Sequence, residues 1–189
     1  MGVLVVTPPD RLVSLDDMKA HLRVTTDDED DLIGAYIDAA GSWIDGPNGW
    51  LGQCIGSQVL EARYSAGRGL TDWLRAPPIR PTMGPLLEVV ELEYWDRQGG
   101  AHTVDVSGFL VEDGSIDGYQ GAPWVMAANR VRLRYRAGFE TVPMAVCQAV
   151  KLLVGQWFRN RSATNVGNIV TELPNGVRAL LGPYRVIRV

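Results

Sequence analysis

The chain has 189 residues, of which 46% are hydrophobic and 21% are charged, a balance typical of a folded globular protein and not of a disordered one. No run of about 18 apolar residues is present, so the sequence predicts no membrane-spanning helix. Residues 1–9 are apolar but carry no basic leader, and we therefore expect synthesis in the cytoplasm rather than export.

The net charge of −4 is unevenly distributed along the chain. Residues 1–50 hold ten acidic and three basic residues, whereas residues 141–189 hold one acidic and six basic residues. One interpretation is that an acidic face meets a basic face of a neighbouring subunit. The other is that the two ends neutralise each other within one subunit.

Two helices are predicted within residues 1–50. Ser14 followed by Asp17 is typical of a helix N-cap and opens a short helix through Leu22. The acidic residues 27–31 then favour the positive end of a second helix dipole, and apolar residues recur at helical spacing from Leu32 until Gly46. We interpret the acidic residues as helix capping and solvation rather than as a metal site or paired catalytic carboxylates.

Residues 58–135 change to a β-strand character. Strands are predicted at 58–64, 109–111 and 130–135, and residues 87–106 form a predicted hairpin around the turn Asp96–Gly100. The strand at 130–135 places arginines on one face, at 130, 132, 134 and 136. This face lacks clustered lysine and an aromatic residue of its own strand, so we predict an ion-paired or subunit-facing surface rather than a nucleic-acid site.

The last part of the chain begins with Pro143, which is well suited to the first turn of a helix. Apolar residues then occupy nearly the whole circumference to Trp157, which predicts a central helix buried on several sides. Gly155 within it suggests that another backbone passes close by. A polar stretch at 162–168 precedes a short helix whose predicted apolar face is Val177, Leu180, Leu181 and Tyr184.

The order of these elements predicts an α+β fold, a small helical bundle with an antiparallel β-region inserted between the N-terminal and C-terminal helices. We expect one domain over residues 1–189. Its parts are N-terminal helices at 1–50, a β-rich insertion at 56–140, a central helix at 141–161, and a loop with the C-terminal segment at 162–189.

No motif for catalysis, metal binding or phosphate binding occurs in the sequence. His21 and His102 stand outside any recognisable motif, and Cys54 and Cys147 are isolated from each other and from histidine. We therefore predict no catalytic residue, no metal and no cofactor. The alternative is a small α+β enzyme or ligand-binding module, with a pocket among Trp73, Trp95 and Trp124.

Several segments in this order resemble one protein family. They are Leu15–Val24, the acidic residues 27–31, the end of the β-region at Tyr135–Phe139, the helix from Pro143 to Arg161, Glu172–Pro174, and Ala179–Arg185. Together they resemble the head-to-tail connector (adaptor) family of long-tailed bacteriophages and gene transfer agents. An alternative within the same particles is a neighbouring stopper or tail-completion protein, which we would expect to be richer in β-structure and to lack the acidic N-terminal helix pair.

The resemblance implies a structural protein without catalytic activity, made in the bacterial cytoplasm and located at the head-to-tail junction of a virion or virus-like particle. Connectors of this family form a ring, typically of twelve subunits, between the portal protein and the stopper or tail-completion protein, and DNA passes through without sequence-specific binding. In relatives the C-terminal segment reaches the portal. Carried over, this assigns as portal-contact candidates Leu173, Pro174, Leu180, Leu181, Tyr184 and Arg185.

A closed ring needs one face of each subunit to meet a different face of the next. The predicted complementary faces are the acidic helix start, with Asp28, Glu29 and Asp31, and the arginine strand, with Arg130, Arg132 and Arg134. The rival hypothesis is that these charges pair within a subunit or face solvent. We further expect the free protein to be monomeric, because the portal would template the ring.

Overall fold

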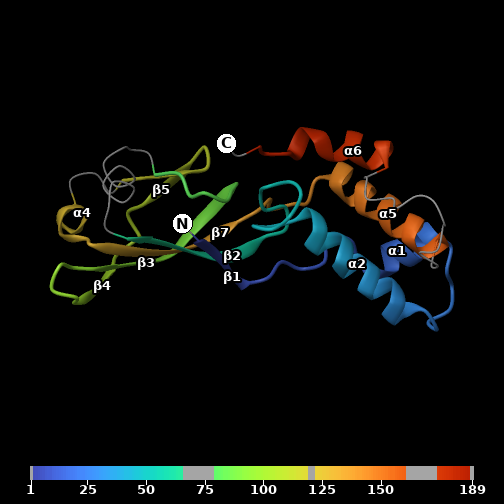
Figure 1. The fold of residues 1–189 in the computed structure, drawn as a ribbon, viewed down its shortest axis with the longest axis horizontal. Helices are drawn as coiled ribbons and strands as arrows, with labels where there is room; N and C mark the ends of the chain where they lie inside the picture. Colours follow the sequence, from blue (N-terminus) through green and yellow to red (C-terminus); the bar gives the residue numbers. More distant parts are fainter. Residues whose placement is uncertain (1, 66–78, 119–121, 161–173, 188–189) are drawn as a thin grey trace, which may run out of the picture. The chain divides into compact units, whose positions relative to one another are not determined.

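The computed structural model describes residues 2–65, 79–118, 122–160 and 174–187. The chain folds as two compact units, each assembled from segments distant in sequence (Figure 1). The sheet unit comprises residues 1–9 and 57–140, and the helical unit comprises residues 10–56 and 141–189. The predicted α+β class, with a β-region between N-terminal and C-terminal helices, is confirmed. The description as a single domain stays a prediction.

The uneven charge along the chain disappears in these units. Residues 10–56 and 141–189 together hold eleven acidic and nine basic residues, and residues 1–9 and 57–140 hold the same numbers. Each unit therefore has a formal charge of −2. The acidic and basic ends of the chain share the helical unit, as the second interpretation of the charge distribution requires.

The helical unit begins with two helices, α1 (Leu15–Leu22) and α2 (Asp30–Ile44). The Ser14 hydroxyl accepts a hydrogen bond from the Asp17 amide at 3.1 Å, which confirms the predicted cap. At the start of α2, Glu29 makes no capping hydrogen bond through its side chain, and the acidic residues of the first turn, Asp30 and Asp31, lie at the positive end of the helix dipole. The buried stripe of α2 packs inside the unit and contains Ile33, Ile37, Ala40 and Ile44.

The C-terminal half of the helical unit contains α5 (Met144–Arg159), α6 (Asn175–Leu181) and the short 3₁₀ helix η1 (Gly182–Tyr184). Pro143 is the N-cap of α5, which confirms the predicted start. The buried face of α5 consists of Val146, Ala149, Val150, Leu153 and Val154. The helix is less enclosed than its composition predicts, because the Met144 side chain is 79% exposed.

Gly155 faces α1, but side chains rather than a backbone come close to it. An added Cβ would lie 3.5 Å from His21 Nε2 and 3.7 Å from Leu22 Cδ2, which are ordinary van der Waals distances. Since alanine favours a helix by about 1 kcal/mol over glycine, we expect Gly155→Ala to stabilise the protein by about that amount. Urea denaturation measures the change, and an unfolding free energy below the wild-type value would indicate a steric conflict with α1.

The sheet unit is built on a five-stranded antiparallel sheet with the strand order β1-β2-β7-β3-β4 (Figure 1). These strands are β1 (Gly2–Thr7), β2 (Gln58–Ser65), β7 (Arg130–Ala137), β3 (Leu86–Trp95) and β4 (Ala101–Val104). Strands β5 (Leu110–Glu112) and β6 (Ser115–Asp117) form a separate pair, and α4 covers Pro123–Ala127. The sequence did not predict β1, β6 or α4, and it assigned residues 1–9 to the N-terminal helical part.

One face of the sheet is apolar and the other is charged. The buried apolar face includes Leu60, Ala62, Leu92, Leu133 and Tyr135. Register irregularities in β3, between Leu86 and Glu88 and between Val89 and Glu91, interrupt the strict alternation that the sequence predicts. As a result Glu88, Glu91 and Glu93 all lie opposite arginines of β7.

Candidate interaction surfaces

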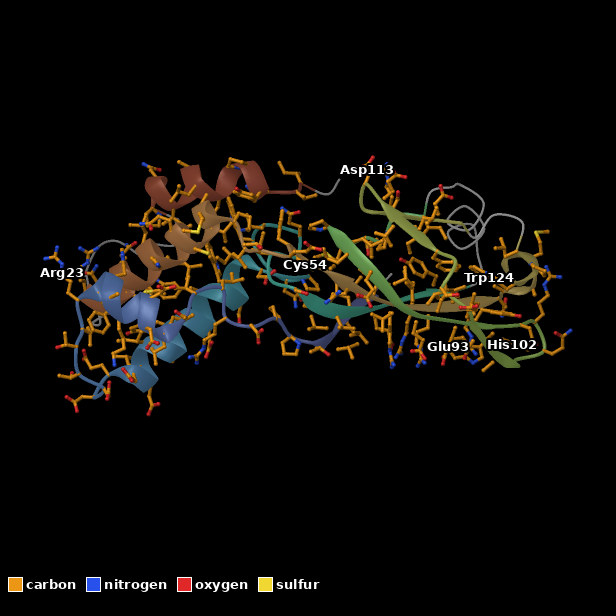
Figure 2. All side chains as sticks on the ribbon, turned by 180° about the vertical axis from the view of Figure 1, so that it is seen from behind. Arg23, Cys54, Glu93, His102, Asp113 and Trp124 are labelled. Atoms are coloured by element: carbon orange, nitrogen blue, oxygen red, sulfur yellow. The ribbon has the colours of Figure 1, made fainter. Side chains whose placement is uncertain are left out.

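Three arginines of β7, Arg132, Arg134 and Arg136, are paired with glutamates of the two neighbouring strands. Arg134 lies 3.0 Å from Glu61 of β2 and 3.1 Å from Glu91 of β3. Arg132 lies 2.6 Å from Glu93, and Arg136 pairs with Glu88 at the end of the strand. Figure 2 marks Glu93 on the sheet. The predicted ion-paired surface is therefore present within a single subunit.

This charged face of the sheet is almost neutral. It contains five arginines, at 63, 130, 132, 134 and 136, and four glutamates, at 61, 88, 91 and 93. A surface that binds nucleic acid needs an excess of positive charge toward the phosphates, and here glutamates form ion pairs with Arg63, Arg132, Arg134 and Arg136. That the arginine strand is not a nucleic-acid site stays a prediction.

Glu61 is the best enclosed member of this face, with a side chain only 4% exposed. Burial by itself would raise the pKa of its carboxyl group, but hydrogen bonds from Arg134 and Arg63 outweigh burial and lower the pKa below 4.5. A carboxylate whose folded pKa is lowered stabilises the fold above its unfolded pKa. That contribution is lost as the pH falls through the folded value.

We expect Glu61→Gln to lower the free energy of unfolding by about 1–2 kcal/mol at pH 7, because two charge-assisted hydrogen bonds lose their anionic acceptor. The difference from wild type should shrink as the pH falls through the lowered pKa of folded Glu61, since wild-type Glu61 then becomes protonated itself. Glu88→Gln is the matched control. Both partners of the Glu88–Arg136 pair are about half exposed, so the control should change stability little. Equal losses in both variants, measured by urea denaturation, would contradict a special role of Glu61.

Two of the tryptophans expected to line a pocket lie on opposite faces of the sheet. Trp95 is on the charged face, where the guanidinium carbons of Arg130 and Arg132 lie 5.2 and 6.0 Å from its ring centroid. Trp124 of α4 lies 6.1 Å from the ring of Tyr94, which points to the other face. Trp73 lies outside the described residues. Trp95 and Trp124 therefore do not line one common pocket.

His102 belongs to the β3–β4 hairpin rather than to a catalytic arrangement. Figure 2 labels His102 in this hairpin. Its Nε2 atom lies 2.8 Å from the Asp96 carboxylate, and its ring stacks on Tyr94 at 4.8 Å between centroids. The same carboxylate accepts hydrogen bonds from the Gln98 and Gly100 amides, so it shapes the turn. Within the described residues, no group of three or more His, Cys, Asp or Glu side chains is arranged to hold a metal ion.

The acidic start of α2 is partly neutralised by one lysine. Lys19 Nζ lies 2.6 Å from Asp27 and 2.6 Å from Asp30, and the hydrogen bonds that it donates to these two carboxylates raise the pKa of Lys19. Asp28 and Asp31 are exposed, and Glu29 is half-buried. Of the three acids predicted to meet a neighbouring subunit, Asp28 and Asp31 therefore have side chains accessible from outside.

The C-terminal segment divides into buried and accessible residues. Val177 and Leu181 are almost fully buried against the helical unit, where α6 contacts α5. Leu181 was predicted to contact the portal, but its side chain is 0% exposed and so serves the core of its own unit. The other described candidates are accessible, with Pro174, Leu180 and Tyr184 half-buried and Arg185 exposed. Leu173 lies outside the described residues.

The segment after α6 is held against the loop that follows α2. The Tyr184 carbonyl accepts a hydrogen bond from Gln53 Nε2 at 2.5 Å, and the Val186 amide donates to the Leu51 carbonyl at 2.8 Å. Gly52 has φ +67°, and a Cβ there would come within 2.5 Å of the Val186 carbonyl oxygen. Glycine is therefore needed both for the backbone conformation and for the close approach of the two segments.

Arg185 completes a stack with two tryptophans that sequence reasoning missed. Its guanidinium carbon lies 4.2 Å from the Trp50 ring centroid, and the Trp50 ring stacks on Trp43 at 6.3 Å with an interplanar angle of 14°. The Trp50 amide donates to the Trp43 carbonyl, which folds the loop back onto the end of α2. We call Trp43, Trp50 and Arg185 the Trp–Arg stack. The signal in the sequence was the Gly46–Gly49 turn, which returns Trp50 to the helix end.

Comparison with protein families and solved structures identifies similar proteins. Residues 12–54 match the model of a family described as phage gp6-like head-tail connector proteins. The matched segment covers α1, α2 and the following loop to Cys54, and it confirms the resemblance to head-to-tail connectors predicted from the order of segments. No curated protein matches the chain.

The solved structures extend the similarity to the whole fold. A chain from the neck of an empty GTA particle computed with C6 symmetry is 24% identical, with a TM-score of 0.71. A chain from the virion of a native gene transfer agent (GTA) particle is 22% identical, with a TM-score of 0.69, and one from the neck of a native GTA particle computed with C12 symmetry is 21% identical, with a TM-score of 0.63. Each match covers 100% of this chain and 97% of the other. At these identities the likeness establishes the fold.

Proposed function

We propose that this protein is a structural head-to-tail connector, or adaptor, of a phage-like particle. The observation that supports this most is the full-length match to chains from gene-transfer-agent necks, in which 100% of this chain is covered at a TM-score of 0.71. The family model over residues 12–54 agrees with it independently. The protein would be made in the bacterial cytoplasm and incorporated at the head-to-tail junction of the particle.

The N-terminal helix pair favours a connector over a neighbouring stopper or tail-completion protein. We expected such a neighbour to lack the acidic pair, whereas α1 and α2 are present and coincide with the segment matched by the connector family. The similar structures are components of particles, which supports a structural protein rather than an enzyme. No observation favours the alternative of a small α+β enzyme or ligand-binding module.

The similar neck structures have C6 and C12 symmetry, and we infer that this chain also works as a ring, of twelve copies. The portal protein lies on one side of the ring, the stopper or tail-completion protein lies on the other, and DNA passes through without sequence-specific contacts. Accessible residues of the C-terminal segment supply the portal contact: Pro174, Leu180, Tyr184 and Arg185.

The charge pairing between subunits also stays a proposal, with Asp28, Glu29 and Asp31 on one side and Arg130, Arg132 and Arg134 on the other. The glutamates already bound to Arg132 and Arg134 reduce the attraction that these arginines exert on a neighbour. Replacing Glu29 and Asp31 together by lysine tests the pairing through ring assembly at low salt. Unchanged assembly would exclude it.

Negative-stain microscopy of the protein mixed with the portal protein of the same genome tests the proposed function. We expect an additional ring on the narrow end of the portal, and a monomer when the protein is sedimented alone. The portal without the added protein is the control. A mixture in which the portal particles gain no density, at protein concentrations well above those of the portal, would exclude the connector assignment.

A further inference from the structure

The first strand of the sheet exposes three large apolar side chains in succession. The exposed fractions are 54% for Leu4, 45% for Val5 and 47% for Val6. Strand β1 pairs with β2 on one side and stands at the edge of the sheet among the described residues. An apolar edge strand offers unpaired backbone groups and apolar contacts to another strand, and it carries no charge or proline that would prevent such pairing.

The exposed side chains of β1 lie on both faces of the sheet. Leu4 is opposite Glu61 and so belongs to the charged face, whereas Val5 is opposite Leu60 and belongs to the apolar face. A surface that bound a flat apolar partner would have its apolar residues on one face only. Apolar side chains on both faces instead fit a strand that is flanked by another strand in the same sheet.

The opposite edge of the same sheet provides a different strand for this contact. Strand β4 pairs with β3 on one side only among the described residues, and Ala101, His102 and Thr103 are exposed. Neither β1 nor β4 contains an acidic residue, lysine or arginine. Two unlike edges on one sheet allow a head-to-tail contact between copies, and repeated contacts of this kind close into a ring.

We propose that β1 of one copy adds to the β4 edge of the next copy, so that the sheets of neighbouring subunits are continuous around the ring. This inference rests on the proposed function, since it specifies the subunit contact of the connector ring. Strand β4 has only four residues, so the added main-chain hydrogen bonds are few. The contact is therefore weak between free copies and forms when the portal aligns them.

The first test places lysine on the edge strand. Leu4→Lys and Val6→Lys are expected to leave the monomer folded, because both side chains are exposed, and to reduce the occupancy of the portal-bound ring about tenfold or more. Val90→Lys is the matched control, since Val90 is 45% exposed but lies on β3, an inner strand. Circular dichroism of the free variants checks folding, and negative-stain microscopy counts ring subunits on the portal.

The second test identifies the two strands in contact. Val5→Cys and Thr103→Cys are placed on separate copies of different mass, in a Cys147→Ser background, and a short bismaleimide is added to the portal-bound complex. A cross-linked product that requires both variants supports the proposal. A product from Val5→Cys alone, or one joining Val5→Cys to the portal protein, overturns it.

The outcomes separate this inference from the function on which it rests. If wild type forms the portal-bound ring and both edge variants form it equally well, the strand contact is excluded and the connector function stands. If wild type adds no density to the portal, the connector function fails and the strand contact fails with it. If Val90→Lys impairs the ring as strongly as the edge variants do, the loss does not come from the edge, and the proposal is overturned.

Discussion

Replacing Leu181 by alanine is expected to lower the free energy of unfolding by about 3 kcal/mol. The Leu181 side chain is 0% exposed, and α6 packs on α5 within the helical unit. Truncating a fully buried leucine removes apolar contacts and leaves a cavity, which costs about 2–5 kcal/mol in well-packed cores. Urea denaturation followed by tryptophan fluorescence measures the loss.

Leu180 is the matched control for this prediction, because it is the neighbouring residue of the same type and is only half-buried. We expect Leu180→Ala to cost less than about 1 kcal/mol and instead to weaken binding to the portal protein. The comparison separates the core role of α6 from its proposed contact role. Similar free energies of unfolding for Leu181→Ala and Leu180→Ala would mean that Leu181 does not pack α6 against α5.

The helical unit could be predicted largely from local signals. Ser14 caps α1 and Pro143 precedes α5, as the sequence indicated, because caps and N-terminal prolines act on the backbone within one turn. The apolar spacing from Ile33 to Ile44 also predicted the buried stripe of α2. These features depend on neighbours three or four residues away, which a single sequence contains.

Features that depend on distant partners could not be predicted in the same way. Strand β1 is apolar without alternation, and it becomes a strand because β2, more than fifty residues later, supplies its hydrogen bonds. The bulges in β3 that align Glu88 and Glu91 with the arginines leave no local sequence signal. The arginine strand was located correctly, but its glutamate partners depend on the register of three strands.

The candidate site in the C-terminal segment was predicted only in part for the same reason. Family resemblance indicated Tyr184 and Arg185, and helical spacing placed Leu181 together with Leu180 on one apolar face. Spacing alone does not distinguish a face that packs on α5 from one that awaits a partner. The contact between Arg185 and Trp50 joins residues 135 positions apart, so it required the folded structure.

Arg185→Glu is expected to weaken binding to the portal protein by about tenfold or more while leaving the helical unit folded. Arginine and tryptophan are the residues most enriched at the energetic centres of protein interfaces. Arg185 is exposed, and its guanidinium carbon lies 4.2 Å from the centroid of the Trp50 ring. The next residue is also held in place, because the Val186 amide donates a hydrogen bond to the Leu51 carbonyl. A side chain held in this way loses less conformational entropy on binding than a free one.

Arg178→Glu is the control for this change, because it reverses the same charge on an exposed residue of α6 that makes no ring contact among the described residues. Biolayer interferometry on immobilised portal protein compares the two variants at low and moderate salt. If only general electrostatic attraction were involved, both variants would bind the portal protein more weakly than wild type to the same extent. Their difference from wild type would then vanish as the salt concentration rises. A specific role of the Trp–Arg stack requires the loss with Arg185→Glu to exceed the control at both salt concentrations. Equal affinities of Arg185→Glu and wild type would remove Arg185 from the portal contact.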